Sequence, residues 1–182
     1  GPVSEGSARV FALSELNSLV DELSIRLENR QHQLEYLDEW VSQQKFASDA
    51  LVQGAPVKEG YRSSEFGWRT DPFTGQNEMH EGVDFSAAEG SEISAVASGL
   101  VTWSAEKTGY GNLVEINHGN GFKTRYGHCK KNLVHVGDMV QKGQVIALLG
   151  NTGRSSGPHV HFEVYKNNRV VDPASYIRTT VP

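Results

Sequence analysis

The chain has 182 residues, enough for one ordinary domain with a sizeable core and some additional length. It is 37% hydrophobic and 21% charged, which excludes disordered and collagen-like chains, and its net charge of −5 argues against nucleic acid as the main partner, because a duplex-binding protein needs a basic face. A single cysteine, Cys129, excludes an intramolecular disulfide and a thiolate metal cage, and no run approaches the roughly 18 apolar residues of a membrane span.

The sequence changes character near Gly54. Residues 1–53 contain nine acidic and four basic residues and only two glycines, whereas the remainder has thirteen residues of each charge and seventeen glycines. The two parts are therefore different kinds of polypeptide, and Gly1-Pro2 at the start is interpreted as a scar of tag removal. The expected parts are a helix at residues 1–53, a linker at 54–62, a β-rich domain at 63–176 and a tail at 177–182.

Residues 1–53 are predicted to form one long helix with a heptad seam. Apolar side chains recur at alternating spacings of four and three residues, with Arg30 in the one polar slot: Leu16, Val20, Leu23, Leu27, Leu34, Leu37 and Val41. A lone helix with this stripe is only marginally stable in water, so the stripe needs a partner. Packing on its own domain, a helical hairpin, a protein regulator and self-association all remain open, and we favour a regulatory or partner-binding arm of coiled-coil type.

From Tyr61 onward the chain consists of short β-like runs separated by glycines. The predicted strands are residues 92–104, 112–118, 121–128, 133–136, 144–149 and 158–166. His118-Gly119-Asn120-Gly121 is typical of a hairpin turn, because glycine and asparagine tolerate positive φ. This regular spacing predicts a mainly β fold, an antiparallel sandwich or barrel-like sheet, preceded by the long helix.

Three short segments carry residues suited to chemistry, and the first contains His80, Gly82 and Asp84. On a continuous strand, residues four apart share a face but lie about 13 Å apart. Gly82 allows the chain to bend and bring the imidazole and the carboxylate together. Alone this motif indicates a metal site only weakly, because His-x3-Asp is frequent by chance.

The second segment is an alternating run that begins at His159. Alternation places His159, His161 and Glu163 on one strand face, and it places Val160, Phe162 and Val164 on the other. The apolar set supplies a core face, so the histidines are predicted to converge on a cleft. The alternative is a pair of exposed strand histidines.

The third segment is Tyr126-Gly127-His128. Tyr126 and His128 are predicted to share a strand face, with room beside Gly127, although a structural histidine would explain this segment taken alone. The other three histidines lack such neighbours: His32 is predicted on the helix surface, His118 in a turn and His135 on the surface.

Taken in order, these segments resemble the lysostaphin/LytM-type zinc endopeptidases, which cut peptide bonds in bacterial cell-wall peptidoglycan. The resemblance runs from about Ser63 to Pro173 and includes Phe66-Gly67-Trp68-Arg69, Gly109-Tyr110-Gly111-Asn112, Gly150-Asn151-Thr152-Gly153 and Ser156-Gly157-Pro158. The stretch at 66–75 and the acidic heptad helix resemble the Gram-negative envelope branch. One departure is Cys129, where leucine is more usual.

The resemblance implies one Zn²⁺ per chain, held by His80, Asp84 and His161, with His128 and His159 in catalysis. Two imidazoles and one carboxylate leave a fourth tetrahedral position for water, as in catalytic rather than structural zinc sites. Which of His128 and His159 is the base and which the electrophile stays open at this stage. Further residues expected to support the site or contact substrate are Tyr126, Glu163, Asn112 and Arg154.

The resemblance further implies a zinc metallo-endopeptidase that hydrolyses peptidoglycan stem peptides or cross-links during cell-wall remodelling or division. Peptidoglycan is then the expected partner, and the expected location is the cell envelope, in the periplasm. The alternatives are a non-hydrolytic protein that activates cell-wall amidases, as in family members that have lost zinc ligands, and a scaffold with a coiled-coil arm. All five polar site residues are retained here, which favours the enzyme.

Overall fold

The computed structural model describes residues 5–177 of the chain, so Gly1-Pro2 and all but the first residue of the predicted tail at 177–182 lie outside the described residues. The chain divides into two compact parts after Lys45. Apart from one long helix and a short 3₁₀ turn, the described residues form antiparallel β-structure. The predicted fold class, mainly β with one N-terminal helix, is confirmed.

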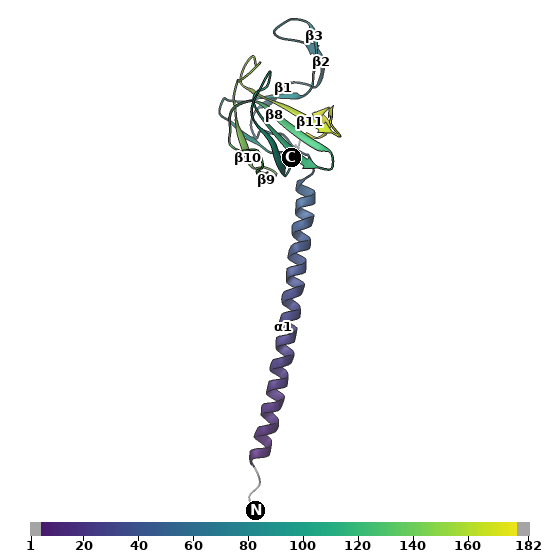
Figure 1. Ribbon diagram of the computed structural model, residues 1–182, viewed down its shortest axis with the longest axis vertical. Coiled ribbons are helices and arrows are strands. Elements are labelled where there is room, and N and C mark those ends of the chain that lie inside the picture. The colour runs from purple at the N-terminus through teal and green to yellow at the C-terminus, as the bar shows by residue number, and fades with distance from the viewer. Residues whose placement is uncertain (1–4, 178–182) are drawn as a thin grey trace, which may run out of the picture. The chain divides into compact units, whose positions relative to one another are not determined.

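Helix α1 (Glu5–Asp49) runs without interruption (Figure 1). No proline and no glycine occurs between Gly6 and Gly54, so nothing in the sequence breaks the helix before its end. The apolar seam predicted along it is exposed: Leu16, Val20, Leu23, Leu27, Leu34, Leu37 and Val41 are each more than half accessible. Within the described residues, no helix is long and apolar enough to span a membrane.

The C-terminal end of α1 belongs to the β domain. The Asp49 carbonyl accepts a hydrogen bond from the Ser98 amide at 2.7 Å, and the Gly54 amide donates to the Tyr176 carbonyl at 3.0 Å. Between these two anchors, Val52 is buried in the core. The helix thus ends at Asp49, and residues 50–53, which are predicted to lie in it, are tied into the β domain at both ends.

The β domain contains one large sheet and one separate hairpin (Figure 1). The large sheet has the order β1-β4-β11-β8-β7-β6-β9, with β10 joined to β8 and β5 and with β12 joined to β11. Its strands are β1 (Tyr61–Ser64), β4 (Val83–Ser86), β5 (Glu92–Ser94), β6 (Gly99–Lys107), β7 (Gly111–Gly119), β8 (Phe122–Asn132), β9 (Met139–Val140), β10 (Val145–Leu149), β11 (His159–Lys166) and β12 (Arg169–Val171). The hairpin consists of β2 (Gly67–Thr70) and β3 (Asn77–His80).

The core lies on one face of the central strands. Val160, Phe162 and Val164 of β11 are fully buried there, as the alternation predicted. Phe162 packs against the ring of Tyr126 in β8, with a centroid distance of 5.4 Å. The opposite face of β11, which carries the two histidines, is left for the site.

Two strand predictions differ from the structure. Residues 92–104 form two strands, because the chain leaves the sheet between β5 and β6. Residues 133–136 are not a strand: Val134 is buried, but the next pairing is made by the short β9 against β6. The remaining four predicted strands correspond to β7, β8, β10 and β11, and periodicity gave no signal for β1 to β4, β9 or β12.

The prediction of His118 in a turn is wrong. His118 lies in β7 and is buried, because its ring bridges two polar groups of the core. Its Nδ1 is 2.9 Å from the Ser98 carbonyl and therefore donates to it, and its Nε2 is 2.8 Å from the Thr124 hydroxyl. Strand β7 continues through Gly119 and the turn consists of Asn120 and Gly121, so the turn prediction began two residues early.

His118 should make the β domain less stable in mild acid. Burial lowers the pKa of His118 below its ordinary value, and the bond to the Ser98 carbonyl offsets this only in part. The unfolded chain therefore takes up a proton as the pH falls through about 6.5, while the folded chain resists it. This contribution to the free energy of unfolding is present above that pH and is lost below it.

Urea unfolding of wild type and His118→Gln at about pH 7.5 and about pH 5.5 measures the effect. The variant should be less stable at the higher pH and should lose less stability on acidification than wild type. His135→Gln, at an exposed position, should behave as wild type. Equal acid sensitivity of wild type and His118→Gln would contradict the prediction.

Candidate metal centre and active site

The first site segment bends as predicted. His80 ends β3 in the small hairpin, and Asp84 lies in β4 of the large sheet, so the two residues belong to different sheets. Gly82 lies between the two strands. The bend brings His80 Nε2 to 3.1 Å from Asp84 Oδ1.

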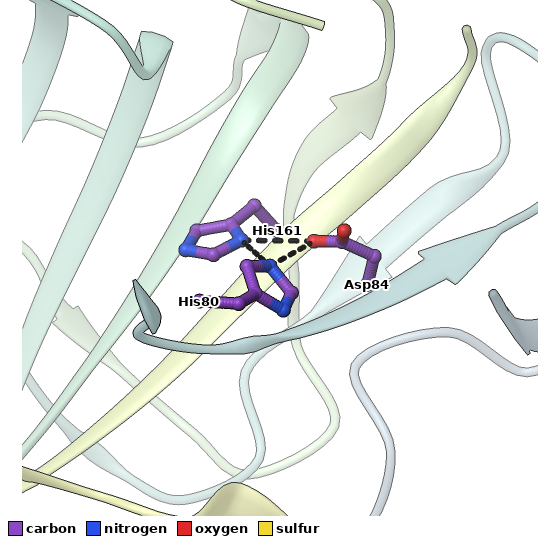
Figure 2. A group of neighbouring side chains, drawn as sticks. All are labelled: His80, Asp84 and His161. Atoms are coloured by element: carbon purple, nitrogen blue, oxygen red, sulfur yellow. Dashed lines mark hydrogen bonds and ion pairs between the residues drawn. The ribbon is translucent and has the colours of Figure 1, made fainter. Parts of the chain in front are cut away.

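The third member of the group comes from the neighbouring strand. His161 of β11 is in register with Asp84 of β4, and its Nδ1 is 2.8 Å from Asp84 Oδ1. His161 Nδ1 is also 3.1 Å from His80 Nε2 (Figure 2). All three side chains are buried, and within the described residues they are the one group of this kind that could hold a metal ion.

Hydrogen bonds outside this group fix which ring nitrogens carry hydrogen. His80 Nδ1 is 2.7 Å from the Glu65 carbonyl, which can only accept, so Nδ1 donates and Nε2 of the neutral ring is bare. His161 Nε2 is 3.1 Å from a carboxylate oxygen of Glu163, so Nε2 donates, and Nδ1 of the neutral ring is bare. Two ring lone pairs and one carboxylate oxygen therefore point into the same small space, where they repel one another unless a cation lies among them.

The donor set fits a zinc ion. Zinc–nitrogen and zinc–oxygen bonds of about 2.0–2.1 Å in a tetrahedral site place ligand atoms about 3.3 Å apart, close to the 2.8–3.1 Å found here. Burial alone would raise the pKa of Asp84, but its interactions with the two adjacent imidazoles, His161 and His80, hold that pKa well below its usual range. Burial likewise disfavours a charged His161, yet Asp84 and Glu163 raise the pKa of His161 to about 9. Without a metal ion, a proton on Nδ1 therefore takes the place of the cation between this ring and Asp84. The site therefore favours positive charge at its centre.

Gly82 is required for space rather than for a positive φ. A Cβ at this position would lie 2.6 Å from the Phe162 carbonyl oxygen and 2.7 Å from Cε1 of His161. Gly82→Ala should therefore displace His161 and lower metal affinity by about 10- to 100-fold, the usual cost of disturbing a ligand's support. A competition assay with a chelating dye measures this affinity.

Gly157 provides the matched control for Gly82. It lies beside the same site, but a Cβ there would meet no atom within 4 Å and its φ is not positive. Gly157→Ala should bind metal as wild type does. Equal affinities for Gly82→Ala and Gly157→Ala would show that the close approach of Gly82 to His161 is unimportant.

His128 and His159 lie side by side next to this group, with ring centroids 4.7 Å apart. His128 Nδ1 donates to the Thr152 carbonyl at 2.8 Å, and His159 Nδ1 donates to the Gly157 carbonyl at 2.8 Å. The Nε2 atom of each neutral ring is consequently bare, and that of His159 is 3.8 Å from Asp84 Oδ1. Burial lowers the pKa of His128 to about 4, an effect that its bond to Thr152 only partly offsets, so this ring is neutral at pH 7.

The prediction that Tyr126 and His128 share a face is wrong. His128 has a φ of 61°, in the left-handed region that interrupts strand alternation, and its ring therefore lies toward His159 and His161. Tyr126 points to the core, where its hydroxyl accepts from the Val96 amide at 3.1 Å and bonds Thr124 at 3.0 Å. The structure thus places Tyr126 on the far side of the sheet from the site.

Glu163 supports the site through a charged network. It is almost fully buried, and besides His161 it accepts from the Tyr110 hydroxyl at 2.8 Å and from Arg125 at 3.4 Å. Burial raises the pKa of Glu163, but its bond with His161 and these neighbours outweigh that effect, so the pKa is lowered and the group stays ionised. Arg125 is held in turn by Glu115 at 2.7 Å.

The other two predicted supporting residues have different positions. Asn112 is not at the cleft: its side chain donates to the carbonyls of Cys129 at 3.1 Å and Lys130 at 3.3 Å, which holds β7 to β8. Arg154 lines the cleft, where it is paired with Asp71 and lies 3.3 Å from Glu78. These contacts tie the loop before β11 to the β2–β3 hairpin.

Sequence reasoning assigned no role to three residues at the site. Arg69 Nη2 is 3.4 Å from Asp84 Oδ2, the oxygen that faces away from the histidines. Tyr110 holds Glu163, and the Glu65 carbonyl holds His80. Arg69 and Tyr110 were noted only as parts of longer matching stretches, and a backbone carbonyl carries no sequence signal.

The five predicted metal and catalytic residues line a single cleft of about 350 Å³. Arg69 of the β2–β3 hairpin lines one wall of the cleft, and Arg154 of the loop before β11 lines the other. The cleft thus brings a group that could hold a cation next to two further imidazoles, an arrangement suited to hydrolysis by activated water.

The comparisons with known proteins agree with this arrangement. The family model described as "Peptidase family M23" matches residues 78–173, more than half of the chain and all five site residues. The chain belongs to peptidase family M23. The predicted resemblance to lysostaphin/LytM-type enzymes is confirmed.

Named relatives share the sequence and the fold of this M23 domain. "Peptidoglycan DD-endopeptidase ShyB" of Vibrio cholerae is 42% identical over 120 residues, which cover 64% of this chain and 28% of that protein. A crystal structure of a zinc-containing peptidase from Vibrio cholerae matches with a TM-score of 0.64 and 37% identity, covering 72% of this chain and 41% of that one. The catalytic domain of lysostaphin from Staphylococcus simulans matches with a TM-score of 0.59 and 31% identity, covering 64% and 91%. The chain spans about a quarter of the length of the curated relatives that it matches, 26% and 28% in two cases.

Proposed function

We propose that this chain is a zinc-dependent endopeptidase that hydrolyses peptide bonds in bacterial peptidoglycan. The observation that carries the proposal is the set of three bare donor atoms on His80, Asp84 and His161, with the bare Nε2 atoms of His128 and His159 beside them. The names of the relatives support the substrate class, and the zinc-containing neighbour supports the choice of metal.

Zinc bound by His80, Asp84 and His161 would lower the pKa of a bound water toward about 7 and polarise the scissile carbonyl. The protein's own contribution is to hold two proton acceptors next to that position. Each of His128 and His159 uses Nδ1 to bond a backbone carbonyl, which leaves Nε2 as the atom that can take a proton from the attacking water and pass it to the leaving amine.

The same hydrogen bonds constrain which ring acts as an electrophile. A bare Nε2 cannot donate to an oxyanion, so stabilisation of the tetrahedral intermediate by either histidine requires prior protonation. Because the pKa of His128 is lowered to about 4, we infer that His128 enters the reaction neutral, as a proton acceptor. Once protonated, an imidazolium with a pKa this low would return its proton readily to the leaving amine.

The second candidate function is a non-hydrolytic activator of cell-wall amidases, or a scaffold with a coiled-coil arm. Neither role needs a metal site whose two histidine tautomers are fixed by Glu65 and Glu163. Retention of this arrangement together with His128 and His159 favours hydrolysis.

Digestion of purified peptidoglycan by the chain tests the proposal directly. Mass spectrometry of the released fragments should show new peptide ends, with activity lost on treatment with a chelator and restored by Zn²⁺. This experiment also identifies the bond that is cut. Fragments indistinguishable from the buffer control, with zinc present in the protein, would contradict the enzyme and favour the activator.

We further propose that the chain acts in the cell envelope, in the periplasm, during wall remodelling or division. The support is the location of the proposed substrate, since a peptidoglycan hydrolase must reach the wall. The exposed acidic helix α1 would then be the part that binds a protein partner.

A further inference from the structure

The apolar seam of α1 follows one heptad repeat, without a change of register, from Leu16 to Val41. With Leu16 at position d, the a positions are Val20, Leu27, Leu34 and Val41, and the d positions are Leu16, Leu23, Arg30 and Leu37. On a straight helix a seven-residue repeat drifts by about 20° per heptad, so only a helix that supercoils with it can follow the seam throughout. The seam is therefore shaped for another helix of the same period.

The charges of α1 are arranged so that two copies can approach each other. All acidic side chains between residues 15 and 38 are exposed, and five of them lie at the outer positions b and c: Glu15, Asp21, Glu22, Glu28 and Glu35. The sixth, Asp38, lies at position e. The e and g positions that flank the seam carry neutral side chains apart from Asp38 and Arg26. Pairing two copies brings no like charges together at these flanks in either orientation.

Arg30 favours an antiparallel over a parallel arrangement of the two helices. In a parallel pair the same d position of both helices meets, so two guanidinium groups would oppose each other inside the seam, which is unfavourable. In an antiparallel pair a positions meet d positions, and Arg30 would lie against the partner's Leu27, with its charged end free to reach water. The opposed helix dipoles add to this preference.

In the antiparallel alignment, each seam residue faces a seam residue of the partner helix. Centred between Leu27 and Arg30, it pairs Leu16 with the partner's Val41, Val20 with the partner's Leu37, and Leu23 with the partner's Leu34. All members of these layers are more than half exposed in the single chain and would be covered together. We propose that α1 is a homodimerisation surface that binds a second copy of this chain as an antiparallel two-stranded coiled coil.

Size-exclusion chromatography with light scattering on the full chain gives the first test. Wild type should have twice the chain mass at high micromolar concentration and should dissociate on dilution. Leu23→Asp combined with Leu34→Asp should be monomeric and less helical, because a lone helix of this kind is marginal. Glu28→Ala, at the outer b position, is the matched control and should remain dimeric. A wild-type monomer at every concentration overturns the proposal and leaves a different molecule as the partner.

Disulfide cross-linking tests the orientation without depending on a disruptive variant. Cys129 is buried and burial raises its pKa to about 12, so it should not react. Leu23→Cys and Leu34→Cys should each cross-link poorly alone under mild oxidation, and an equimolar mixture should form a disulfide-linked pair. Efficient cross-linking of each variant with itself would show a parallel dimer and overturn the antiparallel alignment.

Discussion

Asp84→Ala should abolish peptidoglycan hydrolysis and most of the affinity for zinc. Asp84 is one of the three proposed metal ligands, and its Oδ1 lies within 3.1 Å of both His80 Nε2 and His161 Nδ1. Removing it leaves two imidazoles and no negative charge against the ion, so the loss of rate should exceed the 10²- to 10⁴-fold typical of a single acid or base. His80→Ala and His161→Ala should behave in the same way.

Zinc content by atomic absorption, measured beside digestion of purified peptidoglycan, checks this expectation. Glu106→Ala removes an exposed carboxylate from β6 and controls for the loss of charge. Asp84→Asn keeps the shape of the side chain, and it should bind zinc more weakly than wild type because the amide is neutral. Full zinc content in Asp84→Ala would show that the ligand assignment is wrong.

His128→Ala and His159→Ala should each retain zinc and lose most hydrolysis. Neither histidine belongs to the group of three proposed ligands. Each ring is instead oriented by a backbone carbonyl, that of Thr152 for His128 and that of Gly157 for His159. Loss of one positioned proton acceptor should lower turnover by about 10²- to 10⁴-fold. Zinc content and digestion rate, measured on the same preparations, separate the two effects.

His135→Ala is the histidine control for this pair, because His135 is exposed and remote from the cleft. It should have both normal zinc content and normal turnover. Near-normal turnover with zinc bound in either His128→Ala or His159→Ala would exclude that residue from catalysis.

The parts of the site that periodicity or a short motif encodes were predictable from the sequence. Alternation along β11 places His161 opposite the core residue Phe162, and Gly82 between His80 and Asp84 marks the bend that joins two sheets. The long helix followed from its heptad spacing and from the absence of glycine and proline.

The parts that depend on backbone conformation or on distant contacts were not predictable. Strand alternation put Tyr126 and His128 on one face, and a single left-handed residue separates them. Arg69 reaches Asp84 from a different sheet, and β1 reaches β4 across the intervening hairpin, so no local pattern reports either contact. His118 was misplaced because its burial depends on Ser98 and Thr124, which approach it only in the folded sheet.

The backbone conformation of His128 places an imidazole in the cleft and lowers the stability of the fold. A residue with a side chain held at a φ of 61° raises the free energy of the folded state by about 1–3 kcal/mol relative to a relaxed conformation. Domains of this size are stable by only about 5–15 kcal/mol, so this one residue takes a noticeable share. Glycine would adopt the same conformation without strain but would have no imidazole. The imidazole at position 128 is therefore placed in the cleft at a cost in stability that glycine would avoid.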